Sequence, residues 1–168
     1  MMSEVFNMDE IDKQIIELVQ KQPNLTHTQI ASQVNRSQPT VGMRIKRLEK
    51  AGVLQFQAGI NIKSADLYCA RVDFQTTMPE EVYQLVKKCP FLVNAFRLSG
   101  DINMSILIVG FDLAALDKIV NHHFRNKSYI KKISMNVITD IMSEFIIPLD
   151  MNFDVCDNCF QDGCAADQ

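Results

Sequence analysis

Residues 26–54 read THTQIASQVNRSQPTVGMRIKRLEKAGVL, and this stretch decides the fold of the N-terminal part of the chain. Thr26 and Gln29 have the Thr-x-x-Gln spacing of a capping box, which predicts that a helix begins here and runs to Val34. Asn35 then interrupts the helix, because Asn tolerates the left-handed backbone that a tight turn needs. The stretch therefore begins with one short helix and a turn.

A second helix is predicted directly after the turn, from about residue 38 to residue 51. Ser37 is a good N-cap, and Gly52 suits the position just past the C-terminal end. The apolar residues recur at i, i+4 and i+7 and predict one buried stripe: Val41, Ile45 and Leu48. The remaining faces are polar and basic. Two helices joined in this way form a helix-turn-helix, whose second helix enters the major groove of DNA.

The flanks of this helix pair extend the prediction. An amphipathic helix is expected over residues 9–22, with acids in its first turn and Pro23 at its end. After the pair, residues 53–60 alternate weakly and predict a wing strand. Spacing alone does not separate a DNA-binding unit from a small helical bundle with a solvated basic face, so both interpretations stay open at this point.

The charge is distributed unevenly along the chain. The 168 residues carry a formal net charge of -3, which as an average argues against a nucleic-acid-binding protein. Residues 36–50, however, contain five Lys or Arg and one acid, whereas residues 150–168 contain five Asp and no base. The chain thus combines a local basic patch with an acidic body and an acidic tail.

The composition also predicts where the protein works. No apolar run approaches the roughly 18–20 residues needed to cross a bilayer, and the N-terminus lacks the basic start and apolar core of a signal peptide. A cytoplasmic protein without a membrane partner is therefore expected. In that compartment the five Cys are expected as thiols rather than as structural disulfides.

After about residue 63 the hydrophobic period changes and predicts a second domain. Strand patterns lie at residues 67–75, 91–98, 104–111 and within 130–147, and helical patterns lie at 79–88 and 113–124. The order βαββαβ is that of a ferredoxin-like domain, an antiparallel sheet with two helices on one face. The uncovered face would explain a dimer, because an apolar face must be buried somewhere.

Several motifs in register resemble one known family. They are MDEIDKQIIEL at residues 8–18, QIASQV at 29–34, SQPTV at 37–41 and RIKRLEKAGVL at 44–54. Together they look like the winged helix-turn-helix of the Lrp/AsnC (feast/famine) transcription regulators, and the similarity continues to about Leu149. The resemblance implies an α+β protein with a winged helix-turn-helix domain over residues 1–62, a ferredoxin-like effector-binding and oligomerisation domain over 63–149, and an added tail over 150–168.

The resemblance implies a sequence-specific DNA-binding transcription regulator. Its expected partners are double-stranded DNA and further copies of itself, in a dimer, a tetramer or an octamer. The recognition-helix positions expected to meet DNA are Ser37, Gln38, Thr40, Arg44 and Arg47. Gln and Arg can make paired hydrogen bonds to purine edges, while hydroxyl groups at the helix start can contact phosphate.

The same resemblance implies a site for a small-molecule effector that modulates assembly or DNA affinity. In the family, the loop that matches residues 99–101 lines a small-molecule pocket between dimers, where an acid can meet an amino group. The candidate effector residues are Ser99, Gly100, Asp101 and Asn103. Asn103 stands where many members have Asp. A Gly-Asp pair between two strands is also an ordinary hairpin turn, so the residues themselves leave both roles open.

The tail extends past the family's usual end and contains a C-x2-C-x4-C run: Cys156, Cys159 and Cys164. C-x2-C lets two thiolates meet one metal ion or form one disulfide. Zinc or iron held by these thiols, a thiol redox switch, and a tail without defined chemistry are three interpretations that stay open. The first two would make the protein a metal- or redox-sensing regulator. For Cys69 and Cys89, packing is the expected role.

An enzyme on the same two-domain layout is the remaining alternative, because sirohaem decarboxylases resemble it. Those enzymes place His and Arg residues in the segment that corresponds to residues 94–106. Here that segment contains one Arg and no His, and the chain contains no evident nucleophile–base pair elsewhere. The sequence therefore predicts a regulator with no catalytic residue and no required cofactor.

Overall fold

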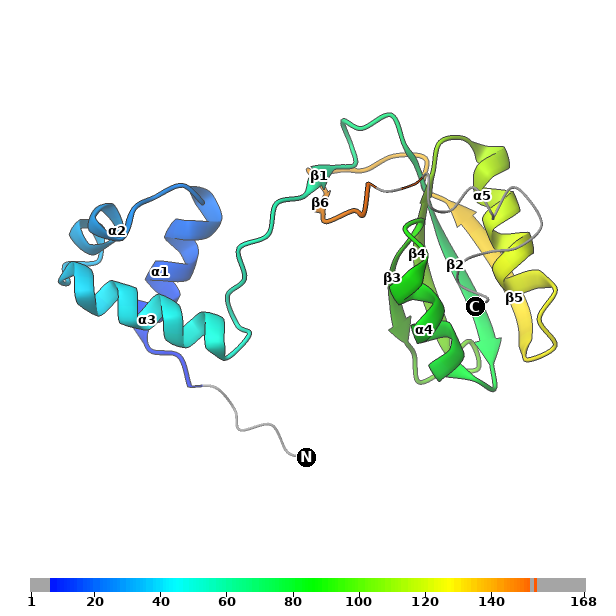
Figure 1. The fold of residues 1–168 in the computed structure, drawn as a ribbon, viewed down its shortest axis with the longest axis horizontal. Helices are drawn as coiled ribbons and strands as arrows, with labels where there is room; N and C mark the ends of the chain where they lie inside the picture. Colours follow the sequence, from blue (N-terminus) through cyan, green and yellow to red (C-terminus); the bar gives the residue numbers. More distant parts are fainter. Residues whose placement is uncertain (1–6, 152, 154–168) are drawn as a thin grey trace. The chain divides into compact units, whose positions relative to one another are not determined.

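The computed structural model describes residues 7–151 and 153, and the chain divides into two compact units, Met1–Gln57 and Ala58–Gln168 (Figure 1). The first unit contains only helices among its described residues, and the second contains the sheets. Each unit buries its own apolar residues. The two units are therefore described separately.

Three helices form the first unit: α1 (Glu10–Lys21), α2 (His27–Gln33) and α3 (Gln38–Lys50). Each begins where the sequence predicts. Asp9 and Thr26 close capping boxes, and the Ser37 hydroxyl accepts a backbone N–H from the first turn of α3. Asn35 adopts a φ of 51° between α2 and α3, and Gly52 a φ of 69° after α3, both in the left-handed region. The predicted helix-turn-helix is confirmed.

The stripe predicted for α3 packs into the core of the first unit. Val41 and Leu48 are fully buried, and Ile45 is 4% exposed. They share one cluster with apolar residues of α1, of α2 and of the C-cap of α2: Ile15, Val19, Ile30, Ala31 and Val34. Burying an aliphatic side chain of this size contributes about 1.5–3 kcal/mol. This cluster stabilises three helices that are too short to be stable alone in water.

The segment after α3 departs from the expected wing. Residues 53–59 form no strand, and strand β1 (Ile60–Asn61) pairs antiparallel with β6 (Ile146–Ile147) of the second unit. Gly59 permits this approach, because a Cβ there would lie 2.8 Å from the backbone oxygen of Ile147. These contacts place β1 with the second unit, whereas the sequence assigned its residues to the first.

The second unit is built around a four-stranded antiparallel sheet with the strand order β3-β4-β2-β5. Along the chain its elements are β2 (Tyr68–Thr76), α4 (Pro79–Lys88), β3 (Leu92–Arg97), β4 (Met104–Gly110), α5 (Leu113–Val120) and β5 (Ile130–Val137). This order and these neighbours are those of the predicted ferredoxin-like domain, which is confirmed.

One face of the sheet and both helices share the main core. Alternate residues of the two central strands are fully buried: Ala70, Val72 and Phe74 on β2, and Met104, Ile106 and Ile108 on β4. The helices add apolar side chains to the same cluster: Val82, Leu116, Ile119 and Val120. The Phe74 and Phe124 ring centroids lie 5.3 Å apart in its centre. Because one cluster contains residues of both helices, α4 and α5 cover the same face.

The opposite face of the sheet is mixed in character. The register pairs Asp73 with Ser105 and Ser105 with Phe96 on this face. Ser105 donates to Asp73 at 2.6 Å, Arg71 forms an ion pair with Asp73 at 2.9 Å, and Phe96 is 51% exposed. At one end, Cys69 packs with apolar residues that include Ile147 of β6. The face expected to be apolar is thus partly polar and partly covered.

The sequence predicted a single α-helix over residues 113–124, whereas the helix observed there changes type before its end. After Val120 it continues as a π-helix, η1 (Asn121–Arg125). This turn buries His123 and Phe124, and His123 Nε2 lies 3.6 Å from the Cys89 thiol. Cys89 and Cys69 are both buried, which agrees with a packing role.

Candidate nucleic-acid interface

The N-terminal turn of α3 brings three of the predicted DNA-contacting residues together. Ser37 and Gln38 are exposed, and Thr40 is half-buried. The hydroxyl oxygens of Ser37 and Thr40 lie 2.8 Å apart and share one hydrogen bond. A helix start offers unpaired N–H groups and the positive end of the helix dipole, which together favour a phosphate.

The other two predicted residues, Arg44 and Arg47, are bound to α1. Arg44 Nη1 lies 2.7 Å from Asp9 Oδ2 and 2.8 Å from Asp12 Oδ1, and Arg47 forms a second ion pair with Asp12. Asp12 is completely buried, whereas the Arg44 side chain is 25% exposed. We call these four residues the acid–base clamp. The clamp ties α1 to α3, a role that the sequence did not assign to either arginine.

The clamp shifts the pKa of Asp9 and the pKa of Arg44. The pKa of Asp9 is lowered to about 2, first because the Asp12 N–H donates to its carboxylate and next because Arg44 does. The carboxylates of Asp9 and Asp12 in turn raise the pKa of Arg44. Asp9 is therefore both the N-cap of α1 and an ion-pair partner of α3, so one carboxylate begins one helix and anchors another.

Titration of Asp9 tests the clamp directly. Carboxyl-detected NMR of the full chain should give an Asp9 pKa of about 2, against the ordinary value of 3.8. In Arg44→Met the pKa should rise only part of the way, because the Asp12 N–H still donates. By linkage, ionised Asp9 stabilises the fold in full above pH 3.8, and this contribution is lost as the pH falls towards 2. A pKa of 3.8 in the parent chain would contradict the clamp.

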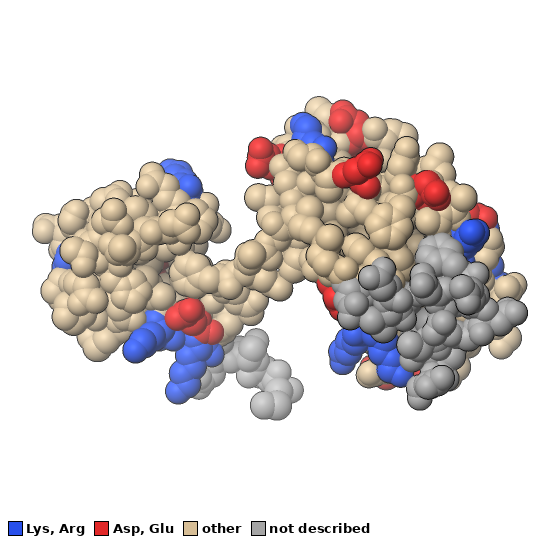
Figure 2. All heavy atoms as spheres, turned by 45° about the horizontal axis from the view of Figure 1, so that its top comes forward, with Lys and Arg blue, Asp and Glu red and all other residues tan. Residues whose placement is uncertain are grey.

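A row of exposed residues lies along another side of α3, next to Arg47, whose side chain is itself 49% exposed. Its residues recur at i, i+4, i+7 and i+11, away from the buried stripe, and all four are exposed: Pro39, Met43, Lys46 and Lys50. We call them the exposed stripe. Figure 2 shows basic side chains gathered at one edge of the first unit beside an acidic one. Sequence reasoning placed none of the stripe in the site, because the helix period does not tell which polar face meets α1.

In the second unit, the candidate effector residues separate into two groups. Three lie exposed in the turn between β3 and β4: Ser99, Gly100 and Asp101. The Asn103 side chain instead forms two hydrogen bonds with the backbone of Thr76, the last residue of β2. Its side-chain oxygen accepts the Thr76 N–H and its NH2 group donates to the Thr76 oxygen, both at 2.8 Å. The amide of Asn103 is thus engaged in shaping the loop.

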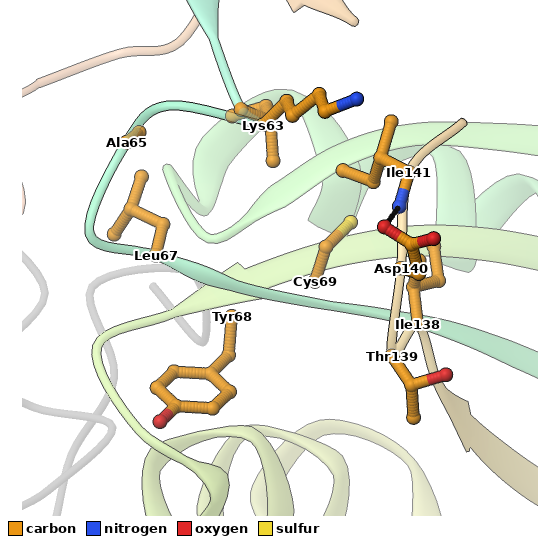
Figure 3. A pocket seen from close by; sticks show the side chains of 10 residues that line it. Lys63, Ala65, Leu67, Tyr68, Cys69, Ile138, Thr139, Asp140 and Ile141 are labelled. Atoms are coloured by element: carbon orange, nitrogen blue, oxygen red, sulfur yellow. Dashed lines mark hydrogen bonds between the residues drawn. The ribbon is translucent and has the colours of Figure 1, made fainter. Parts of the chain in front are cut away.

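A separate pocket of about 250 Å³ lies beside the connections that precede β2 and follow β5 (Figure 3). Lys63 and Leu67 come from the first connection, Asp140 and Ile141 from the second, and Cys69 from β2 itself. Burial raises the pKa of the Cys69 thiol, which therefore stays neutral. The sequence offered no signal for this pocket, because its walls come from segments that are far apart in the chain.

The part of the chain that the structure describes contains no group of three His, Cys, Asp or Glu side chains placed to hold a metal ion. Among the same residues, no helix is long and apolar enough to cross a membrane. The candidate metal ligands lie outside the described residues: Cys156, Cys159 and Cys164. Phe153, the last described residue, packs on Phe91 and Phe111 with ring centroids 5.1 and 5.2 Å away. The second unit thus holds the chain as far as this aromatic cluster.

Comparisons with known proteins agree with this architecture. A family described as winged helix-turn-helix DNA-binding matches residues 8–55. The chain is 25% identical over 137 residues to the transcriptional regulator LrpA of Pyrococcus horikoshii, which covers 79% of this chain and 97% of that protein. It is 30% identical over 105 residues to the transcriptional regulator FL11 of Pyrococcus furiosus, which covers 60% of this chain and 70% of that protein.

Solved structures share the fold. A transcriptional regulator from Neisseria meningitidis in complex with L-Met has a TM-score of 0.74 at 20% identity, covering 87% of this chain and 98% of that one. AsnC of E. coli has a TM-score of 0.70 at 16% identity, covering 84% and 98%. The named relatives are transcriptional regulators and not enzymes, as predicted for this protein. The chain belongs to the Lrp/AsnC family of helix-turn-helix transcriptional regulators.

Proposed function

We propose that the protein regulates transcription by binding specific sites in double-stranded DNA through α3, with the exposed stripe turned towards the major groove. The acid–base clamp carries this proposal, because it fixes one side of α3 on α1 and leaves the stripe in solvent. The Ser37–Thr40 pair suits a backbone phosphate at the start of the helix. Lys46 and Lys50, one turn apart, suit phosphates towards its other end.

The test is binding of the full chain to its own promoter region and to random duplexes of equal length. We expect a preference for the promoter and an affinity that falls steeply with salt. Lys46→Ala and Lys50→Ala should each weaken binding to every sequence and lower the salt slope by about 1. Lys21→Ala on α1 is the matched control and should change neither. Equal binding to promoter and random DNA would contradict the proposal.

We also infer that the second unit joins copies of the chain. The mixed face of its sheet offers Phe96 between polar side chains, and a palindromic DNA site needs two copies of α3. A dimer, a tetramer or an octamer would each supply them. Native mass spectrometry of the full chain would count the subunits, and a monomer at micromolar concentration would contradict this inference.

We infer, in addition, that a small molecule at the turn between β3 and β4 modulates assembly or DNA affinity. The relative from Neisseria meningitidis in complex with L-Met supports an amino acid as the ligand class. The exposed Asp101 carboxylate suits an ammonium group, and Gly100 leaves its backbone open to a ligand. Thermal shifts of the full chain with single amino acids test this, and Asp101→Asn should abolish a shift that the parent shows.

Asn103→Ala should lower the free energy of unfolding of the second unit by about 2 kcal/mol with no ligand present. The reason is that Thr76, 4% exposed, would lose the partners of both its backbone groups. Urea unfolding followed by tyrosine fluorescence reports this unit, because all three Tyr lie in it and the chain has no Trp. Asn94→Ala, an exposed change, is the control. An unchanged free energy of unfolding would show that the Asn103 hydrogen bonds do not stabilise the end of β2.

We infer a second sensing site in the tail, where Cys156, Cys159 and Cys164 would hold zinc or iron or form a redox switch. The aromatic cluster supports it, because Phe153, three positions before Cys156 in the chain, packs on Phe91 and Phe111 of the second unit. Elemental analysis of protein purified without chelator tests metal content. DNA affinity under metal or oxidant tests sensing. If the triple Cys→Ser variant behaves like the parent in every condition, the tail has neither role.

A further inference from the structure

We propose that Met43 reads the C5-methyl group of a thymine in the major groove, and so sets the base preference at the centre of each half-site. The proposal rests on the proposed function, since it requires that α3 enters the groove. It assigns a specificity-determining role to a residue that neither the motif pattern nor the comparisons point to.

The placement of Met43 is the first argument. It lies in the middle of the exposed stripe and is 68% exposed, more than the other large apolar side chains described in the first unit. The apolar residues that pack α3 into the core lie on a different face, and Met43 is not among them. When α3 enters the major groove with the exposed stripe, Met43 is therefore placed to contact the edges of the bases.

The acid–base clamp is the second argument, because it engages the arginine beside Met43 in ion pairs with Asp9 and Asp12. Arg44 directly follows Met43, and a free guanidinium there would suit the paired acceptors of guanine. Its Nη1 atom instead contacts both Asp9 oxygens, at 2.8 and 2.7 Å, and one Asp12 oxygen at 2.8 Å. The centre of α3 thus presents a thioether where the sequence pattern suggested an arginine.

The chemistry of the groove supplies the third argument. Among the four bases, only thymine places a methyl group in the major groove, at C5. Met is unbranched and polarisable, so it can adapt to a methyl group without a rigid fit. Burying one methyl-sized group changes an affinity by about fourfold, which is the effect expected here for each thymine contacted.

The experiment removes one methyl group at a time from the DNA. A preferred duplex is first selected with the full chain from a random pool. Each thymine is then replaced singly by deoxyuridine, which keeps the base pair and deletes only the methyl. We expect the parent to lose about fourfold in affinity at one thymine position in each half-site, and Met43→Ala to bind the thymine and uracil duplexes equally. Met8→Ala, an exposed Met outside α3, is the matched control and should retain the loss.

The outcomes separate the inference from the proposed function. If Met43→Ala shows the same uracil penalty as the parent, or if the parent shows no penalty at any thymine, Met43 does not read a methyl group. If the parent selects no preferred duplex at all, the proposed function fails as well. Circular dichroism of Met43→Ala should match the parent, because the side chain contributes to no core.

Discussion

Replacing Arg44 and Arg47 together by Met is expected to lower the free energy of unfolding of the first unit by about 3–5 kcal/mol. The change leaves the Asp12 carboxylate completely buried without either of its cations. A buried unpaired charge is among the most destabilising defects in a protein. Adding Asp12→Leu should recover most of the loss, because an apolar replacement of the whole buried group removes the uncompensated charge.

Hydrogen exchange measured on peptides of α1 and α3 localises this effect to the first unit of the intact chain. Lys46→Met with Lys50→Met is the matched control, since it makes the same kind of change twice on the same helix but away from the acids. The control should weaken DNA binding and leave protection unchanged. If the Arg44/Arg47 variant kept full protection and lost only DNA binding, the two arginines would be DNA contacts and the clamp would not stabilise the unit.

The starts of the three helices could be predicted from sequence because each depends on residues close together in the chain. Thr26 with Gln29 and Ser37 before Pro39 are local signals, and local signals survive into the fold. The ferredoxin-like order was predictable for a similar reason. The alternation of β2 and the apolar run at residues 106–109 of β4 are typical of strands that pack into a core.

The role of Arg44 could not be predicted in the same way, because its partners lie 32 and 35 positions away in the chain. One signal did exist. Arg44 lies three positions after the buried Val41 and four before the buried Leu48, so its Cα lies at the edge of the face that packs on the other helices. The sequence identified the acids at the start of α1 only as residues that favour a helix start. That they also form ion pairs with α3 could be seen only in the tertiary structure. The same holds for β1, whose partner β6 lies at the other end of the second unit.

Phe74→Ala is expected to lower the free energy of unfolding of the second unit by about 3–5 kcal/mol, because it empties a fully buried site beside Phe124. Tyrosine fluorescence during urea unfolding measures the loss. Phe96→Ala is the matched control: it removes the same side chain from the same sheet, but from a position that is 51% exposed. The control should lower the free energy of unfolding far less.

The same variant tests whether the two units are stabilised independently. Their buried clusters share no residue, so hydrogen exchange of α1, α2 and α3 should be unchanged in Phe74→Ala. Preferred DNA should then bind more weakly only through lost assembly, with the affinity of a single half-site retained. If protection of α3 fell together with that of β2, the first unit would depend on the second for its stability. A ligand bound to the sheet domain could then act on α3 through its folding rather than through the spacing of two copies.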